Sequence, residues 1–141
     1  MNAKDVFSRY STQVHRWIFS ASSGRFLGEF RGMPVLILTT TGRKSGKARS
    51  TMLTAPIADD DRVVIVASYG GDDRNPTWFL NLRANPEVRV TMRGTTRTMR
   101  ARVATSDEKA TLWPAVTEAN PGYGDYQRKT DRDIPLVILE P

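Results

Sequence analysis

Apolar side chains recur at helical spacing near the start of the chain. Within residues 4–19 they occupy Val6, Phe7, Tyr10, Val14, Trp17 and Ile18. At about 100° per residue these positions share one face of a helix, and most polar and basic residues occupy the other. We therefore expect an amphipathic helix over residues 1–20. Its apolar face suits packing on a core, and its basic face also suits a peripheral contact with the inner face of a cell membrane.

From residue 34 onward the apolar residues form short runs that are typical of strands. We expect six strands, with the sequences MPVLILTT, RSTMLTAPIA, RVVIVAS, NPEVRVTMRG, TTRTMRARVA and IPLVILEP. Short loops separate the first strand from the second and the fourth from the fifth, which predicts two antiparallel hairpins. Pro56 has no amide hydrogen to donate, so it predicts an edge or a bulge in the second strand.

Two segments after the third strand carry signals for the start of a helix. PTWFLNLRA is expected to have Asn75 as its N-cap and Pro76 at its first helical position. In TSDEKATLWPAVTEA, Thr105 and Glu108 stand at capping-box spacing. The later stretch NPGYGDYQRKTDRD is interpreted as a loop. Hairpins without alternating βαβ units predict a mainly β, α+β fold: an antiparallel barrel with an N-terminal helix and two further helices.

Length and composition narrow the classes of protein. A chain of 141 residues suits one domain over residues 1–141, with the barrel in 34–141. The absence of cysteine excludes disulfides and thiolate chemistry. The only histidine, His15, falls on the polar face of the first helix, which argues against a zinc or a Ser-His-Asp hydrolase, and we expect no metal. No apolar run is long enough to span a bilayer, so a cytoplasmic location is expected.

The net charge of +6 predicts an anionic partner, and its distribution is uneven. The segment TTTGRKSGKARS, residues 39–50, concentrates four cations, which are Arg43, Lys44, Lys47 and Arg49. Only three residues separate Gly42 from Gly46, and Ala48 follows Lys47, so the segment is not a nucleotide-binding P-loop.

Two interpretations of this basic segment stay open. It could be a plain solvated turn. Alternatively, its cations join Ser45 and the backbone amides around Gly46 to form a basin of positive potential. Three or four charge-assisted hydrogen bonds, roughly 1.5–3 kcal/mol each, would then hold a phosphate or a string of carboxylates. Nucleic acid is not expected, because the segment offers no aromatic side chain for base stacking.

Four segments, in this order, resemble the deazaflavin-dependent nitroreductase family. They are TTTGRKSGKxR, VASxGG, NPxWxxNLxANP and the closing GYxxYQRKTxRxIPLVxLEP, which lie between Pro34 and Pro141. The family comprises actinobacterial oxidoreductases on a split β-barrel, and they use coenzyme F-420, an 8-hydroxy-5-deazaflavin with a phosphate and an oligoglutamate tail. The resemblance therefore implies this fold and this cofactor. An FMN-binding split-barrel oxidoreductase is the alternative, followed by a non-catalytic binder of an anionic cofactor, a membrane or nucleic acid.

By matching position, the resemblance implies which residues bind the cofactor. The expected ligands of the phosphate and the tail are Arg43, Lys44, Ser45, Gly46, Lys47 and Arg49. The expected lining of the deazaflavin pocket comprises Met52, Ala67, Ser68, Gly70, Gly71, Trp78 and Asn81. Independently of the family, two adjacent glycines after a buried strand suit a close approach of backbone to a flat ligand.

The chemistry must come from a bound cofactor, because no protein side chain here can carry a hydride. The resemblance implies hydride transfer from the reduced deazaflavin to a small electron-poor acceptor such as a quinone, a nitroaromatic or an enone. Tyr123, Ser68 and Tyr126 are the candidates to hydrogen-bond or protonate that acceptor. The chain departs from the family at Tyr69, where lysine is frequent, and at Asn120, where an aromatic can stand. Both departures border the expected substrate site.

Overall fold

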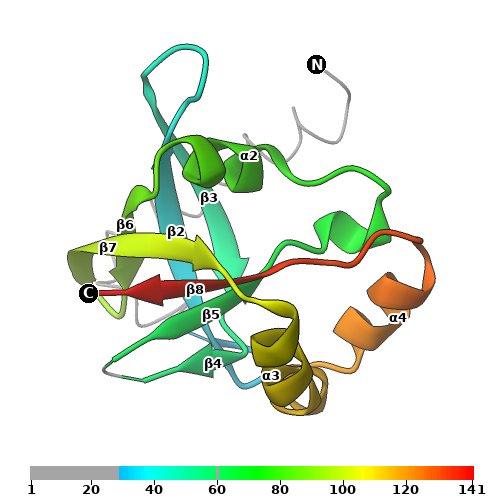
Figure 1. Cartoon of the computed structure of the whole chain (residues 1–141). Helices are drawn as coiled ribbons and strands as arrows, with labels where there is room; N and C mark the ends of the chain where they lie inside the picture. Colours follow the sequence, from blue (N-terminus) through cyan, green and yellow to red (C-terminus); the bar gives the residue numbers. More distant parts are fainter. Residues whose placement is uncertain (1–28, 60) are drawn as a thin grey trace.

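The computed structural model describes residues 29–59 and 61–141, which form a strongly curved antiparallel sheet with helices at its ends (Figure 1). The strands in this part of the chain are β1 (Glu29–Phe30), β2 (Met33–Thr41), β3 (Ala48–Thr54), β4 (Ile57–Ala58), β5 (Val63–Val66), β6 (Glu87–Met92), β7 (Thr95–Val103) and β8 (Leu136–Glu140). The helical elements are the 3₁₀ turn η1 (Tyr69–Gly71), α2 (Thr77–Ala84), α3 (Ser106–Ala119) and α4 (Gly122–Arg128). The helix expected over residues 1–20 lies outside the described residues.

The sheet has the order β1-β2-β6-β7-β8-β5-β4, and β3 pairs with β2. Every pairing is antiparallel, and the hairpins β2–β3 and β6–β7 are those expected from the sequence. The mainly β fold is thus confirmed, but the described residues contain eight strands, more than the roughly six expected from the sequence. The two-residue strands β1 and β4 could not be expected from the sequence, because two residues are too few to show an alternation of apolar and polar positions. Pro56 falls between β3 and β4 and divides the long second strand that the pattern predicted.

The helices agree with the sequence in part. The capping box of α3 is present, with the Thr105 hydroxyl accepting from the Glu108 amide and the Glu108 carboxylate accepting from the Thr105 amide. Helix α2 begins at Thr77 with Pro76 as its N-cap, one residue later than expected. Helix α4 was interpreted as a loop, because it is short and contains two glycines, which disfavour a helix.

Two apolar clusters occupy the two faces of the sheet. Strand β5 belongs to both, with Val63 and Ile65 in the barrel interior and Val64 and Val66 on the outer face. The outer cluster lies under α3 and α4, which appear at the lower right of Figure 1. A strand that is buried on both faces has a continuous run of apolar residues in its sequence, and β5 has the sequence VVIV. Within the described ranges, no helix has the length and apolar character needed to cross a membrane.

Candidate active site

The basic segment forms the loop that joins β2 to β3, and it extends away from the barrel in Figure 1. The loop is closed by its own backbone: the Gly42 amide donates to the Lys47 carbonyl at 2.8 Å, and the Gly46 amide donates to the Gly42 carbonyl at 2.8 Å. The Lys47 amide also donates to the Ser45 hydroxyl, at 3.2 Å. Gly46 has φ +71°, a conformation that side chains with a Cβ rarely adopt. These bonds hold the loop as a defined turn.

The four cations of this loop lack carboxylate partners among the described residues. Their side chains are exposed, and none is within ion-pair distance of an acid in residues 29–59 or 61–141; they are Arg43, Lys44, Lys47 and Arg49. Elsewhere on the surface several cations do form ion pairs, such as Arg102 with Glu108 and Glu140. Within the described residues the loop is therefore a concentrated positive charge without a compensating acid, and a multiply charged anion would relieve its self-repulsion.

Asn81 of α2 fixes the base of the basic loop. It is only 2% exposed, its Oδ1 accepts from the Arg43 amide at 3.1 Å, and its Nδ2 donates to the Thr40 hydroxyl at 3.2 Å. Trp78, from the same helix, is half-buried and packs against the barrel interior with Phe79. The family resemblance implied that Asn81 and Trp78 face the cofactor. In the structure both hold protein parts together, and their contact with a ligand stays a prediction.

Strand β3 leads from the basic loop to the helices at the other end of the site. Ser50, Met52 and Thr54 lie on its outer face, while Leu53 packs with Leu36 toward the barrel interior. This alternation follows from the two-residue period of a strand. The seven residues of β3 span about 20 Å at roughly 3.3 Å each. An elongated ligand could therefore lie along this outer face with its anionic end at the loop.

Tyr123 of α4 stands where the outer face of β3 ends. Its ring is 6% exposed, and its hydroxyl shares a 3.0 Å hydrogen bond with the Thr54 hydroxyl. The Tyr126 ring packs edge-on against it, with centroids 6.4 Å apart. Burial raises the pKa of the Tyr123 phenol, and the hydrogen bond between the Tyr123 and Thr54 hydroxyls opposes that rise in part. Tyr123 is therefore neutral at physiological pH and able to donate a hydrogen bond.

Ala67 and Ser68 follow β5 directly and are both buried. Ser68 is 8% exposed, and its hydroxyl makes no hydrogen bond to another residue of the described part of the chain. A buried hydroxyl without a partner loses the free energy of a hydrogen bond unless a ligand or water supplies one. Ser68 is thus available to bind a polar atom of a ligand.

The glycine pair after Ser68 has a structural role. Gly71 has φ +84°, and a Cβ there would lie 2.9 Å from the Tyr126 carbonyl oxygen and 3.1 Å from the Lys129 side chain. Gly71 therefore allows α4 to pack on η1, whereas Gly70, with φ +66°, is exposed. The pattern predicted that the pair admits a flat ligand. At Gly71 the structure shows helix α4 in close approach instead, and a ligand contact at Gly70 stays a prediction.

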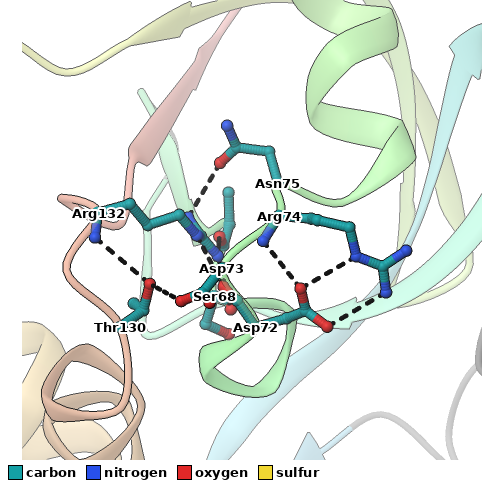
Figure 2. A network of polar contacts seen from close by, with 8 residues as sticks. Ser68, Asp72, Asp73, Arg74, Asn75, Thr130 and Arg132 are labelled. Carbon is teal, nitrogen blue, oxygen red and sulfur yellow. Dashed lines mark hydrogen bonds and ion pairs between the residues drawn. The ribbon is translucent and has the colours of Figure 1, made fainter.

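Arg132 holds the segment that carries Ser68, as Figure 2 shows. Its Nε donates to the Asp72 carbonyl at 2.8 Å and one terminal nitrogen donates to Asn75 Oδ1 at 2.9 Å. The other terminal nitrogen donates to the carbonyls of Ala67 at 3.2 Å and Ser68 at 2.9 Å. Partial burial lowers the pKa of Arg132, which still keeps its charge. A single guanidinium thus connects four points of the segment between residues 67 and 75.

The segment that contains Arg132 is itself fixed from both sides. The Thr130 hydroxyl donates to Asp73 Oδ1 at 2.8 Å (Figure 2), and Gln127 Nε2 donates to the Arg132 carbonyl at 2.7 Å. Gln127 Oε1 accepts from the Ile134 amide at 3.0 Å. Sequence reasoning assigned these residues no role. For three of them the signal was present, because Gln127, Thr130 and Arg132 belong to the QRKTxR part of the closing motif.

Comparison with known proteins identifies the family. The model of the F420H(2)-dependent quinone reductase family matches residues 11–141. The chain belongs to this family. This confirms the resemblance to deazaflavin-dependent reductases, and the matched range includes the basic loop, Ser68 and Tyr123.

Relatives of this member of the F420H(2)-dependent quinone reductase family cover most of its length. It is 39% identical to an F420H(2)-dependent quinone reductase of Mycobacterium tuberculosis over 132 residues, 90% of this chain and 87% of the relative. A solved structure named as an F420-H2 dependent reductase (FDR-A) is 40% identical, covers 76% of this chain and 94% of its own, and has a TM-score of 0.69. A solved domain-swapped dimer is 36% identical with a TM-score of 0.69, covering 89% and 98%.

Proposed function

We propose that this chain binds coenzyme F-420 and reduces a quinone with it. The observation that carries the proposal is the basic loop at one end of β3, whose cations have no carboxylate partner in the described part of the chain, with the neutral phenol of Tyr123 at the other end. Reduced coenzyme F-420, when bound, supplies a hydride. The named relative from Mycobacterium tuberculosis and the family match support this cofactor over FMN.

The basic loop would hold the anionic parts of the cofactor. Lys44, Ser45, Gly46 and Arg49 contact the phosphate and the first carboxylates, while Arg43 and Lys47 add to the potential. Each charge-assisted bond contributes roughly 1.5–3 kcal/mol, so three or four of them suffice for a dissociation constant near the micromolar range. Because Asn81 and the loop's own amides fix its shape, little ordering of the loop is needed on binding.

The ring end of the cofactor would lie between the outer face of β3 and the segment after β5. Met52 supplies an apolar side chain on β3 and Ala67 is small and fully buried. Ser68 offers the unpartnered hydroxyl described above. Arg132 keeps Ser68 in place by binding its carbonyl oxygen, so this arrangement is formed before any ligand arrives.

Tyr123 and Ser68 would stabilise the acceptor as it is reduced. A quinone that receives a hydride develops negative charge on its carbonyl oxygen, and a neutral phenol can donate a hydrogen bond to that oxygen. The raised pKa of Tyr123 favours this donor role over release of its proton. Tyr126 packs against Tyr123 and would orient it. Nitroaromatics and activated enones present a comparable electron-poor centre with an oxygen acceptor, and we extend the proposal to them.

Anaerobic mixing of the protein with reduced coenzyme F-420 and a short-chain naphthoquinone tests the proposal. We expect the absorbance of the oxidised deazaflavin to return at a rate proportional to enzyme. Parallel reactions with a nitroaromatic and an enone test the wider range of acceptors. Turnover with reduced FMN but none with reduced F-420 would support the FMN alternative, and tight binding of F-420 without oxidation would indicate a carrier.

A further inference from the structure

A cavity lies at the other end of the barrel from the basic loop. It has a volume of about 390 Å³ and is lined by residues of β4, β5 and the β6–β7 hairpin. Its walls include Val63, Val90, Met92 and Met99. Cavities of roughly 300–1,000 Å³ are typical of small-molecule sites. No residue proposed above for coenzyme F-420 lines it.

The register of the sheet separates this cavity from the basic loop. Met92 pairs with Leu36 near the start of β2, whereas the loop follows Thr41 at the end of that strand. Five residues of strand between these points span about 17 Å. A ligand bound by the loop and the outer face of β3 would therefore leave the barrel end free.

Arg97 points into the barrel at the entrance of this cavity. It pairs with Val90 across the β6–β7 hairpin, and directly paired residues of antiparallel strands project to the same face of a sheet. Val90 and Met99 belong to the apolar interior, so Arg97 shares that inner face. Arg100 instead pairs with Glu87 on the outer face of the same hairpin.

The charge of Arg97 is not neutralised within the described residues. Arg97 is half-buried and makes no hydrogen bond or ion pair to a side chain in residues 29–59 or 61–141. Among the described residues, Asp59 is the one acid that lines the cavity, and its carboxylate already binds other groups of the protein. It accepts from the amides of Asp61 and Arg62 at 2.9 Å and forms an ion pair with Arg62. A cation that faces the apolar residues of the cavity is complementary to a ligand with an anionic group and an apolar chain.

We propose that this barrel end binds a small amphiphilic carboxylate. The chain of the ligand lies against Val63, Val90 and Met99, and its carboxylate accepts hydrogen bonds from the Arg97 guanidinium. Arg93, in the turn between β6 and β7, also lines the cavity and adds to its positive potential. The site is independent of the proposed reductase function, because it uses none of the same residues.

Methionine methyl groups report on the two sites separately. The chain has five methionines, of which Met92 and Met99 line the barrel-end cavity and Met52 lies on the outer face of β3. In protein labelled with ¹³C at the methionine methyls, octanoate is expected to shift the Met92 and Met99 signals in a saturable way and to leave Met52 unchanged. Octanol has the same chain without the charge, and it is expected to bind about tenfold or more weakly.

A matched pair of variants tests the role of the charge. Arg97→Gln is expected to weaken octanoate binding about tenfold or more, while Arg100→Gln, on the outer face of the same strand, leaves it unchanged. The Met52 signal serves as the check that each variant is folded. Equal binding of octanoate and octanol, or shifts confined to Met52, would overturn the proposal. So would unchanged octanoate binding by Arg97→Gln, or shifts only at concentrations where octanoate forms micelles.

Discussion

The burial of Tyr123 determines what its hydroxyl can do. The ring contributes to the apolar cluster under α3 and α4, and the hydroxyl reaches Thr54 at the end of β3. The same side chain therefore packs the helices onto the sheet and places a neutral donor at the edge of the proposed site. A substitution that keeps the ring separates these two roles.

Tyr123→Phe keeps the ring and removes the hydroxyl. We expect quinone turnover to fall roughly tenfold or more, because one hydrogen-bond donor to the developing charge is lost. The dissociation constant of coenzyme F-420 should change little. Steady-state kinetics together with a binding titration measure both quantities. Thr54→Val is the control for the lost Thr54 contact, and equal rate losses in the two variants would assign the effect to that contact.

The raised pKa of Tyr123 predicts a pH dependence of stability. Because the folded protein holds the phenolic proton more tightly than the unfolded chain, this contribution is complete below the ordinary tyrosine pKa of about 10. It is lost as the pH rises above that value, where the unfolded chain releases the proton first. The free energy of unfolding, measured by urea titration between neutral pH and pH about 11, should fall less steeply in Tyr123→Phe than in the wild type. Identical slopes would mean that Tyr123 titrates normally.

At the scale of elements, the proposed cofactor site depends on side-chain hydrogen bonds between segments that are distant in the sequence. Asn81 connects α2 to the β2–β3 loop, and Arg132 connects the segment before β8 to the one after β5. Neither connection joins neighbours in the chain. The Ser68 segment should therefore be sensitive to changes at residue 132, which lies 64 residues away in sequence.

Arg132→Lys retains the charge but removes the planar guanidinium. A single ammonium cannot reach acceptors on Asp72, Asn75 and Ser68 together, so we expect a loss of about 3 kcal/mol in the free energy of unfolding. Amide exchange in residues 67–72 should accelerate, and kcat should fall more than the affinity for coenzyme F-420. The control is Arg128→Lys, which alters an exposed arginine whose ion-pair partner in the described part of the chain is Asp125. Equal effects at both positions would refute a specific role for Arg132.

At the scale of the whole molecule, the features that could be predicted from the sequence are those set by residues close together in the chain. The two hairpins follow from their alternating strands, the α3 capping box follows from Thr105 and Glu108, and the basic loop is visible as a charge cluster. Helix α4 was missed because its glycines oppose a helix and tertiary packing on η1 stabilises it. The Arg132 contacts were missed because their acceptors lie 57–65 residues away. The inward direction of Arg97 required the strand register.

The arrangement as a whole places the two proposed sites at different ends of one barrel. The outer face of β3 connects the basic loop with Tyr123, and the barrel interior opens at the β6–β7 turn. Because the two proposed sites share no residue, ligands at the two ends should bind independently. Within the proposed cofactor site, the charge of the basic loop is the feature on which cofactor binding should depend most.

Fluorescence titration of coenzyme F-420 with the double variant Lys44→Ala, Arg49→Ala tests this feature most directly. A charge-matched control, Arg93→Ala with Arg100→Ala, removes the same net charge from the other hairpin. We predict that the loop variant binds at least about tenfold more weakly, with a shallower salt dependence, while the control binds almost like the wild type. Wild-type affinity in the loop variant, or an equal loss in both double variants, would contradict a cofactor site at the basic loop.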